Sequence, residues 1–158
     1  MLTGSIALLP AVAGADGGAV RASKQHGNYQ VTVFTDPTPL LAGPVDVSVF
    51  VQDVGTGQPI LDGQIDVEVA PRGRSSETIR LAATRAAASN KLFQAAQLDL
   101  PHASWWTFAV IVRLPTDSMD LHFELEAGDP PPNWRSLWPW FCWPFLVIAL
   151  FALSRRSR

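Results

Sequence analysis

The chain has 158 residues, which fits one domain of ordinary size with short extensions and is too few for two full hydrophobic cores. Hydrophobic residues make up 47% of the chain and charged residues only 16%, so part of the apolar content is predicted to face lipid. The formal net charge of -2 argues against nucleic-acid binding, and the single cysteine excludes an internal disulfide and any multi-cysteine metal site.

Residues 1–24 are predicted to be a signal peptide or a mobile N-terminal segment. The short apolar run 6–12 is followed by Ala13-Gly14-Ala15, which has the small-x-small form of a signal-peptidase site. The run is interrupted by Pro10 and no Lys or Arg precedes it, which departs from the usual signal-peptide pattern. Export from the cytoplasm is favoured, and a mobile apolar tail is the alternative.

From residue 25 to residue 128 the apolar residues recur with a period of two, which predicts a domain of half-buried strands. In the clearest run, 45–52, every second residue is valine and most of the residues between are polar. Turns with Gly and Pro separate most runs, and only the alanine-rich stretch 82–89 suggests a helical turn, with a loop as the alternative. The seven candidate strands are 29–34, 45–52, 65–69, 78–83, 92–100, 105–113 and 119–126.

Seven short strands with one apolar face each predict an all-β fold, a seven-stranded immunoglobulin-like β-sandwich. Consecutive residues of a strand point to opposite faces, so one of Trp105 and Trp106 is expected in the core. Trp106 has the same parity as Phe108 and is assigned to the core, which leaves Trp105 outside. We predict that Trp105 and Phe50 belong to a sheet surface near the proline-rich spacer that contacts a partner.

Residues 129–136 are predicted to be a stiff proline-rich tether, because proline runs favour polyproline II. The tether leads into a predicted single transmembrane helix, 137–154, whose first seventeen residues carry no charge and would span about 26 Å. The alternative, a buried core helix, is disfavoured because the segment has no polar face. Pro144 is expected to kink the helix or to delay its start.

Tryptophans gather at the N-terminal end of this span, and arginines follow its C-terminal end. Indole side chains favour the headgroup boundary, whereas arginines are hard to translocate and hold their end of the span in the cytoplasm. The basic tail 155–158 is therefore predicted to be cytoplasmic, and the β-sandwich 25–128 to lie in the periplasm or at the cell surface. The membrane-anchoring residues are Trp134, Trp138, Trp140, Trp143, Arg155, Arg156 and Arg158.

The order of these features resembles the YtkA-like and FixH-like group of small bacterial extracytoplasmic sandwiches. The likeness begins with the opening strand 29–34, the turn Pro37-Thr38-Pro39 and the valine strand that starts at Gly43-Pro44. It continues through the stretch 57–67, which opens with a Gly-x-Pro turn, and through the phrases 91–95 and 100–106, where a Leu-Pro pair leads to tryptophans. It covers about a hundred residues.

The resemblance implies a membrane-associated accessory role without catalysis, in some members near copper handling or respiratory-oxidase assembly. A copper carrier or metallochaperone is therefore the alternative function. Copper prefers clustered Met, His or Cys ligands, and those of this chain are scattered along the sequence. Met119 and His122 are three residues apart and face opposite sides of a strand, so they are not expected to chelate together. The candidate metal ligands are His26, His102, Met119 and His122.

No nucleophile elbow, phosphate loop, dinucleotide fingerprint or zinc-protease motif occurs in the chain, so it is not predicted to be an enzyme. Asp46, Asp66 and Glu68 alternate with valines and are assigned to the wet faces of strands. Asp53, Asp62 and Asp66 supply too few oxygen ligands for calcium. The predicted function is a noncatalytic, membrane-anchored binding or assembly module that contacts a membrane protein or complex and the lipid bilayer, with no cofactor.

Overall fold

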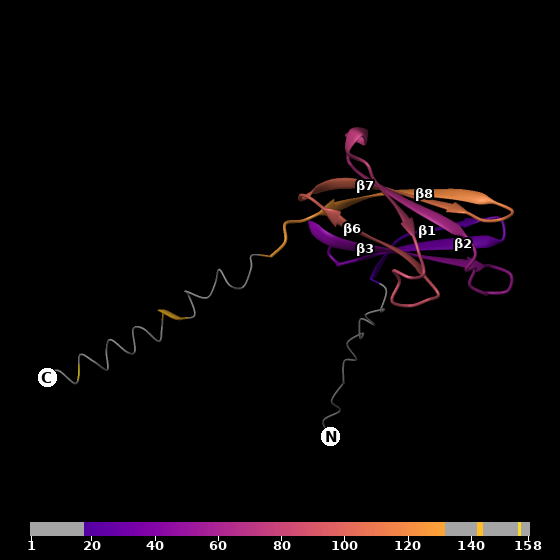
Figure 1. Ribbon diagram of the computed structural model, residues 1–158, viewed down its shortest axis with the longest axis horizontal. Coiled ribbons are helices and arrows are strands. Elements are labelled where there is room, and N and C mark those ends of the chain that lie inside the picture. Colours follow the sequence, from indigo (N-terminus) through magenta and orange to yellow (C-terminus); the bar gives the residue numbers. More distant parts are fainter. Residues whose placement is uncertain (1–17, 132–141, 144–154, 156–158) are drawn as a thin grey trace, which may run out of the picture.

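Two four-stranded antiparallel sheets pack face to face in the computed structural model, which describes residues 18–131, 142, 143 and 155 (Figure 1). One sheet has the strand order β1-β2-β3-β6 and the other has the order β5-β4-β7-β8. The all-β sandwich expected from the sequence is confirmed. Its elements are β1 (Ala19–His26), β2 (Tyr29–Asp36), β3 (Gly43–Asp53), β4 (Gln64–Pro71), the 3-10 turn η1 (Ser75–Glu77), β5 (Ile79–Ala83), β6 (Gln94–Leu100), β7 (Ser104–Arg113) and β8 (Ser118–Ala127).

The described sandwich has eight strands, one more than the seven expected. The additional strand, β1, starts at Ala19, within the residues 1–24 that the sequence pattern assigned to an N-terminal segment. It is an edge strand with mostly exposed side chains, so no alternation of apolar residues marks it. A register shift between Val20 and Ala22 disrupts the period further. This strand is held by backbone pairing with β2, and the pattern of side chains along the sequence gives no sign of that pairing.

The alanine-rich stretch 82–89 forms no helix. β5 ends at Ala83, and Thr84 then pairs with Ala95 of β6 through backbone hydrogen bonds of 2.9 and 3.0 Å. The Lys91 ammonium holds the turn that follows by donating to three of its carbonyl oxygens at 2.7–3.3 Å. Pairing with β6 therefore overrides the helix propensity of alanine, and it joins the two sheets along one side.

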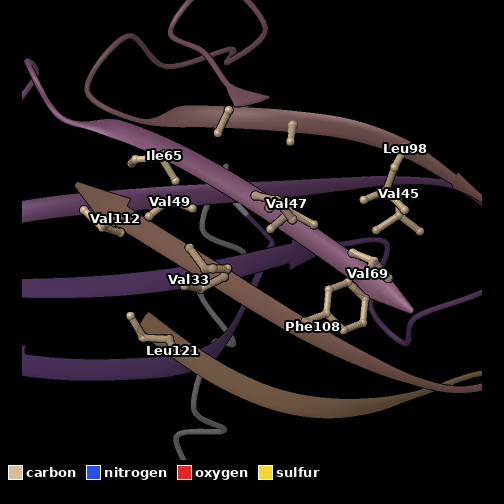
Figure 2. Packing of buried hydrophobic residues seen from close by; sticks show 14 of the residues in the cluster. Val33, Val45, Val47, Val49, Ile65, Val69, Leu98, Phe108, Val112 and Leu121 are labelled. Carbon is tan, nitrogen blue, oxygen red and sulfur yellow. The ribbon is translucent and has the colours of Figure 1, made fainter. Parts of the chain in front are cut away.

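The core lies between the two sheets and is built mainly from valines. The four alternating valines of β3 are at most 3% exposed, which confirms the pattern predicted for this strand. Figure 2 shows side chains of this cluster from both sheets, among them Val47 of β3, Val69 of β4 and Phe108 of β7. Trp106 is 1% exposed and Trp105 is 44% exposed, which confirms the parity argument for the tryptophan pair.

The edge strands β1 and β8 close the other side of the sandwich. Lys24 of β1 lies opposite the buried Val31 in the register, so its side chain starts toward the second sheet. Its Nζ donates to the backbone carbonyl of Asp120 on β8 at 2.8 Å. An inward-directed lysine on an edge strand also discourages pairing with another chain.

The chain leaves the sandwich beside the loop that joins β2 to β3. The Gly128 N–H donates to the Leu40 carbonyl at 3.0 Å, and the Ala42 N–H donates to the Gly128 carbonyl at 2.9 Å. β1 begins beside the same loop: Arg21 Nη2 donates to Thr38 Oγ1 of the loop at 3.4 Å, and Arg21 Nε donates to Thr35 Oγ1 near the end of β2 at 2.7 Å. Both segments that continue beyond the sandwich therefore start at this end, which we call the exit end.

The predicted tether and transmembrane helix lie almost wholly outside the described residues. Of the tether 129–136 only residues 129–131 are described, and of the span 137–154 only residues 142 and 143. Across the parts of the chain that the structure describes, no helix has the length and apolar character needed to cross a bilayer. Of the anchoring residues, Trp143 and Arg155 are described and exposed, whereas Trp134, Trp138, Trp140, Arg156 and Arg158 lie outside the described residues.

Asp53, at the end of β3, organises the loop that follows. Its Oδ1 accepts hydrogen bonds from the backbone N–H and the hydroxyl of Thr56 at 2.8 and 3.0 Å, and its Oδ2 accepts one from the Asn28 amide. The hydrogen bond from the Thr56 backbone N–H is the largest cause that holds the pKa of Asp53 below its ordinary value. The carboxylate thus links the β1–β2 turn to the β3–β4 loop.

Asp53→Asn is expected to remove a pH-dependent part of the stability. The folded-state pKa of Asp53 is depressed, so its stabilisation is present above the unfolded-state pKa of about 3.9 and is lost as the pH falls through the folded-state value. Between about pH 6 and about pH 2.5, the urea midpoint should therefore fall further for the native chain than for Asp53→Asn. Asp62→Asn, in the same loop, is the matched control for the removal of one carboxylate. Equal falls in all three proteins would contradict this role of Asp53.

Candidate functional site

The two predicted partner-binding residues lie on the outer faces of different sheets. Phe50 stands on β3 between the buried Val49 and Val51, so it points away from the core on the β1-β2-β3-β6 sheet. Trp105 precedes the buried Trp106 on β7, so it points outward from the other sheet. The two residues therefore do not form the one surface that was expected, and each belongs to its own set of neighbours.

Phe50 belongs to a group of three phenylalanines on the outer face of its sheet. The ring centroid of Phe93, which lies just before β6, is 5.3 Å from that of Phe50 and 5.5 Å from that of Phe34 on β2. The Phe34 and Phe93 rings meet edge to face at 75°, an arrangement that aromatic pairs favour. All three side chains are half-buried. We call these residues the phenylalanine cluster.

Two exposed aliphatic side chains extend the phenylalanine cluster. Val20 of β1 lies opposite Phe34 in the register and is 58% exposed, and Leu92, next to Phe93, is 47% exposed. Burial of this apolar surface against a partner would stabilise the complex by about 25 cal/mol per Å² removed from water. Contiguous apolar surface of this kind marks interaction sites. The outer face of the β1-β2-β3-β6 sheet is therefore a candidate binding surface.

Phe34 and Phe93 were not identified from the sequence. Phe34 is one residue after the buried Val33 and three after the buried Val31 of the same strand, and these odd spacings are a local signal that it points outward. Phe93 was assigned to a strand 92–100, whereas β6 begins only at Gln94. Its partners lie 43 and 59 positions earlier in the chain, and no local pattern reports a contact over that separation.

Trp105 lies on the other sheet, close to the exit end. It pairs with Glu126 in the β7–β8 register, one residue before β8 ends. The Arg72 guanidinium lies 5.9 Å from the centre of its ring, and Arg72 Nε is 3.4 Å from Glu124 Oε2. An indole with an arginine above it offers apolar, cationic and hydrogen-bonding contacts in one place.

Three of the four candidate metal ligands lie along the seam between β1 and β8 but have separate neighbours. His26 Nε2 is 3.4 Å from Asp117 Oδ2, and His122 Nε2 is 2.9 Å from Asp120 Oδ2. Met119 is 5% exposed and lies in the core, whereas His122 is exposed on the outer face. The alternation expected for these two residues is confirmed.

The fourth candidate, His102, lies in the β6–β7 loop, at the end of the sandwich opposite the His26 turn. Its ring centroid is 5.2 Å from that of Trp106, and its carbonyl accepts a hydrogen bond from the indole N–H at 3.3 Å. Within the described part of the chain, no three His, Cys, Asp or Glu side chains are grouped so that they could hold a metal ion. The geometry therefore gives the copper interpretation no assembled site among these residues.

Carboxylates on the β5-β4-β7-β8 sheet form ion pairs across strands. Asp66 of β4 pairs with Arg113 of β7, and Glu68 Oε1 lies 3.2 Å from Arg80 Nε on β5. Glu68 and Arg80 are directly opposite in the register, and pairs of this kind contribute modestly to sheet stability. These acids therefore lie on the wet face of the sheet, as the alternation with valines predicted.

The two antiparallel sheets form an all-β sandwich, which fits the immunoglobulin-like description expected from the sequence. No protein-family model and no curated protein matches the chain. Among solved structures, it is similar to the crystal structure of a DUF4426 family protein from Pseudomonas aeruginosa PAO1, with a TM-score of 0.55 and 13% sequence identity over 70% of this chain and 96% of that chain. At this identity the likeness shows the fold alone. It supports a β-sandwich domain and not the YtkA-like or FixH-like name.

Proposed function

We propose that the protein is a noncatalytic, membrane-anchored extracytoplasmic module that binds a membrane protein or complex. The phenylalanine cluster carries this proposal. Its three rings, with Val20 and Leu92, stand on the outer face of a sheet whose inner face already packs the core. Aromatic side chains are enriched where proteins meet their partners, and a few such anchors provide most of the binding free energy.

The membrane anchor in this proposal rests on the C-terminal sequence. The uncharged stretch 137–153, with tryptophans before and within it and arginines after it, has the features of a single span whose C-terminal end is cytoplasmic. Residues 129–136 would reach about 25 Å at most as polyproline II, which keeps the sandwich near the bilayer. Trp105 and Arg72 lie toward the exit end, where an indole and a guanidinium suit contact with headgroups.

Export in this proposal rests on residues 6–15. Cleavage after Ala15 would leave the sandwich whole, because β1 begins only at Ala19. A signal peptide and an ordered first strand are therefore compatible in this chain.

A native complex is expected to depend on the phenylalanine cluster. The tagged full-length chain, extracted from membranes of its own host in mild detergent, should migrate in blue native gels as an assembly larger than the monomer. Phe50→Ala combined with Phe93→Ala should weaken this assembly by about thirtyfold or more, because even a single aromatic hot spot at an interface contributes about 2 kcal/mol. The matched control is Ile111→Ala with Leu81→Ala on the other sheet, which should leave the assembly intact.

Recovery of monomer alone from the native chain, or equal loss in the control, would rule out this use of the cluster.

The topology is checked in the same cells with Thr116→Cys, in the exposed β7–β8 turn. A membrane-impermeant maleimide should label this residue in intact cells. Labelling only after lysis would place the sandwich in the cytoplasm and contradict the proposal.

A further inference from the structure

Three aspartates border the phenylalanine cluster on the same outer face. Asp36 ends β2 and lies opposite Asp46 of β3, and Asp99 of β6 lies opposite Pro44 of β3. They line a shallow open hollow of about 580 Å³, with Gln97 between them. Asp36 and Asp99 are exposed, and Asp46 is half-buried with its Oδ2 accepting a hydrogen bond from Ser48 at 2.6 Å. We call these residues the aspartate border.

Among the described residues, no basic side chain forms an ion pair with the aspartate border. Every charged side chain at an outward position of β2, β3 and β6 is one of these aspartates. The ion pairs of the described residues lie elsewhere. Acids of β4 and β8 are matched by arginines, and the imidazoles of His26 and His122 lie beside Asp117 and Asp120. Arg21, on the neighbouring strand β1, is turned to Thr35 instead. Like charges directly opposite in a sheet are unfavourable, so a cation placed here would be stabilising.

The aspartate border and the phenylalanine cluster form one continuous surface. Ser48 lies between Asp46 and Phe50 on β3, and it is opposite Phe34 in the register. Outward residues two positions apart on a strand are separated by about 7 Å. Acid groups and aromatic rings are therefore within reach of neighbouring side chains on one short segment of a partner.

We propose that this surface docks a cationic segment of a partner protein, in which Lys or Arg side chains meet the aspartate border and an apolar side chain inserts at the phenylalanine cluster. The proposal rests on the proposed function and adds the chemistry of the partner. The negative charge of the aspartate border favours a partner with positive charge at this surface. A second copy of the same face would bring aspartates against aspartates, and an anionic bilayer surface would be repelled.

The test uses the full-length chain in nanodiscs of phosphatidylcholine, with empty nanodiscs subtracted. The probe is a fluorescent peptide of alternating Lys and Leu, compared with a Glu/Leu peptide and a Lys/Ser peptide of the same length. The Lys/Leu peptide should bind, with an affinity that falls as salt rises, while the Glu/Leu peptide should not bind. The Lys/Ser peptide, which lacks the apolar anchor, should bind about tenfold more weakly.

Substitutions on each sheet locate the binding. The double substitution Asp46→Asn with Asp99→Asn should lower the affinity for the Lys/Leu peptide about tenfold, and so should Phe50→Ala alone. Asp120→Asn with Glu124→Gln, two acids on the outer face of the other sheet, should leave the affinity unchanged. Far-ultraviolet circular dichroism of each variant confirms that its sandwich is folded, so that a loss of affinity reports on the surface.

The outcomes separate this inference from the proposed function. The proposal of a cationic partner would be overturned if the Lys/Leu and Glu/Leu peptides bound equally well. It would also be overturned if both pairs of acid substitutions lowered the affinity for the Lys/Leu peptide equally. A native assembly that still depends on Phe50 and Phe93 would leave the proposed function standing in that case. If the native chain is monomeric in membranes and yet binds the Lys/Leu peptide as expected, the surface chemistry is upheld and the stable complex is not.

Discussion

Trp106→Ala is expected to lower the free energy of unfolding by about 3–5 kcal/mol, the range found for truncation of large buried aromatic side chains. The indole is 1% exposed and lies between Pro71 of β4 and Leu125 of β8 in the sheet register. Its N–H donates to the His102 carbonyl at 3.3 Å. Truncation therefore leaves a cavity near the exit end and also removes the donor from a part-buried carbonyl.

The neighbouring tryptophan provides the matched control. Trp105→Ala removes an indole of the same size that is 44% exposed, so the expected loss is about 1 kcal/mol or less. Urea unfolding of the full-length chains in one detergent, followed by circular dichroism, measures both. Similar losses for the two variants would mean that burial in the sandwich does not distinguish them.

Gly18→Ala is expected to detach the start of β1 and to cost about 2–4 kcal/mol. A Cβ at this position would lie 2.4 Å from the Thr35 carbonyl oxygen and 2.7 Å from its carbonyl carbon. These are backbone atoms of β2, so no change of rotamer relieves the contact. The residue also has φ of +78°, a conformation that side chains other than glycine disfavour.

Gly57→Ala separates the two causes. Gly57 has φ of +69°, and a Cβ there would meet nothing within 4 Å, so only the conformational cost of about 1–2 kcal/mol applies. Hydrogen exchange of the β1–β2 amides, together with urea midpoints, should show a larger loss for Gly18→Ala and fast exchange confined to β1. Equal midpoints and an unchanged β1 would show that the close approach to Thr35 is relieved by backbone movement.

The sandwich core could be predicted from the sequence because its signal is local. Along β3 the valines alternate with other residues, and this period is enough to assign the buried face. The same parity placed Trp106 inside and Trp105 outside. β1 could not be found in this way, because an edge strand is ordered by backbone pairing and its side chains are mostly exposed.

The candidate binding surface was predicted only in part, because it is assembled by register between distant strands. Phe50 was identified from its outward position, but its ring contact with Phe93 depends on how β3 and β6 pair. The β2–β3 pairing sets Asp46 opposite Asp36, and the β3–β6 pairing sets Asp99 opposite Pro44, two positions from Asp46. Single-strand patterns report which side a residue faces and do not report which residues lie beside it.

The way in which Gly128 is fastened has a mechanical consequence. Its N–H and carbonyl are hydrogen-bonded to the loop between β2 and β3, which belongs to the sheet opposite β8. These two hydrogen bonds therefore tie the residue that follows β8 to the opposite layer of the sandwich. A force on the residues that follow Gly128 would therefore reach the β2–β3 loop of one sheet as well as β8 of the other.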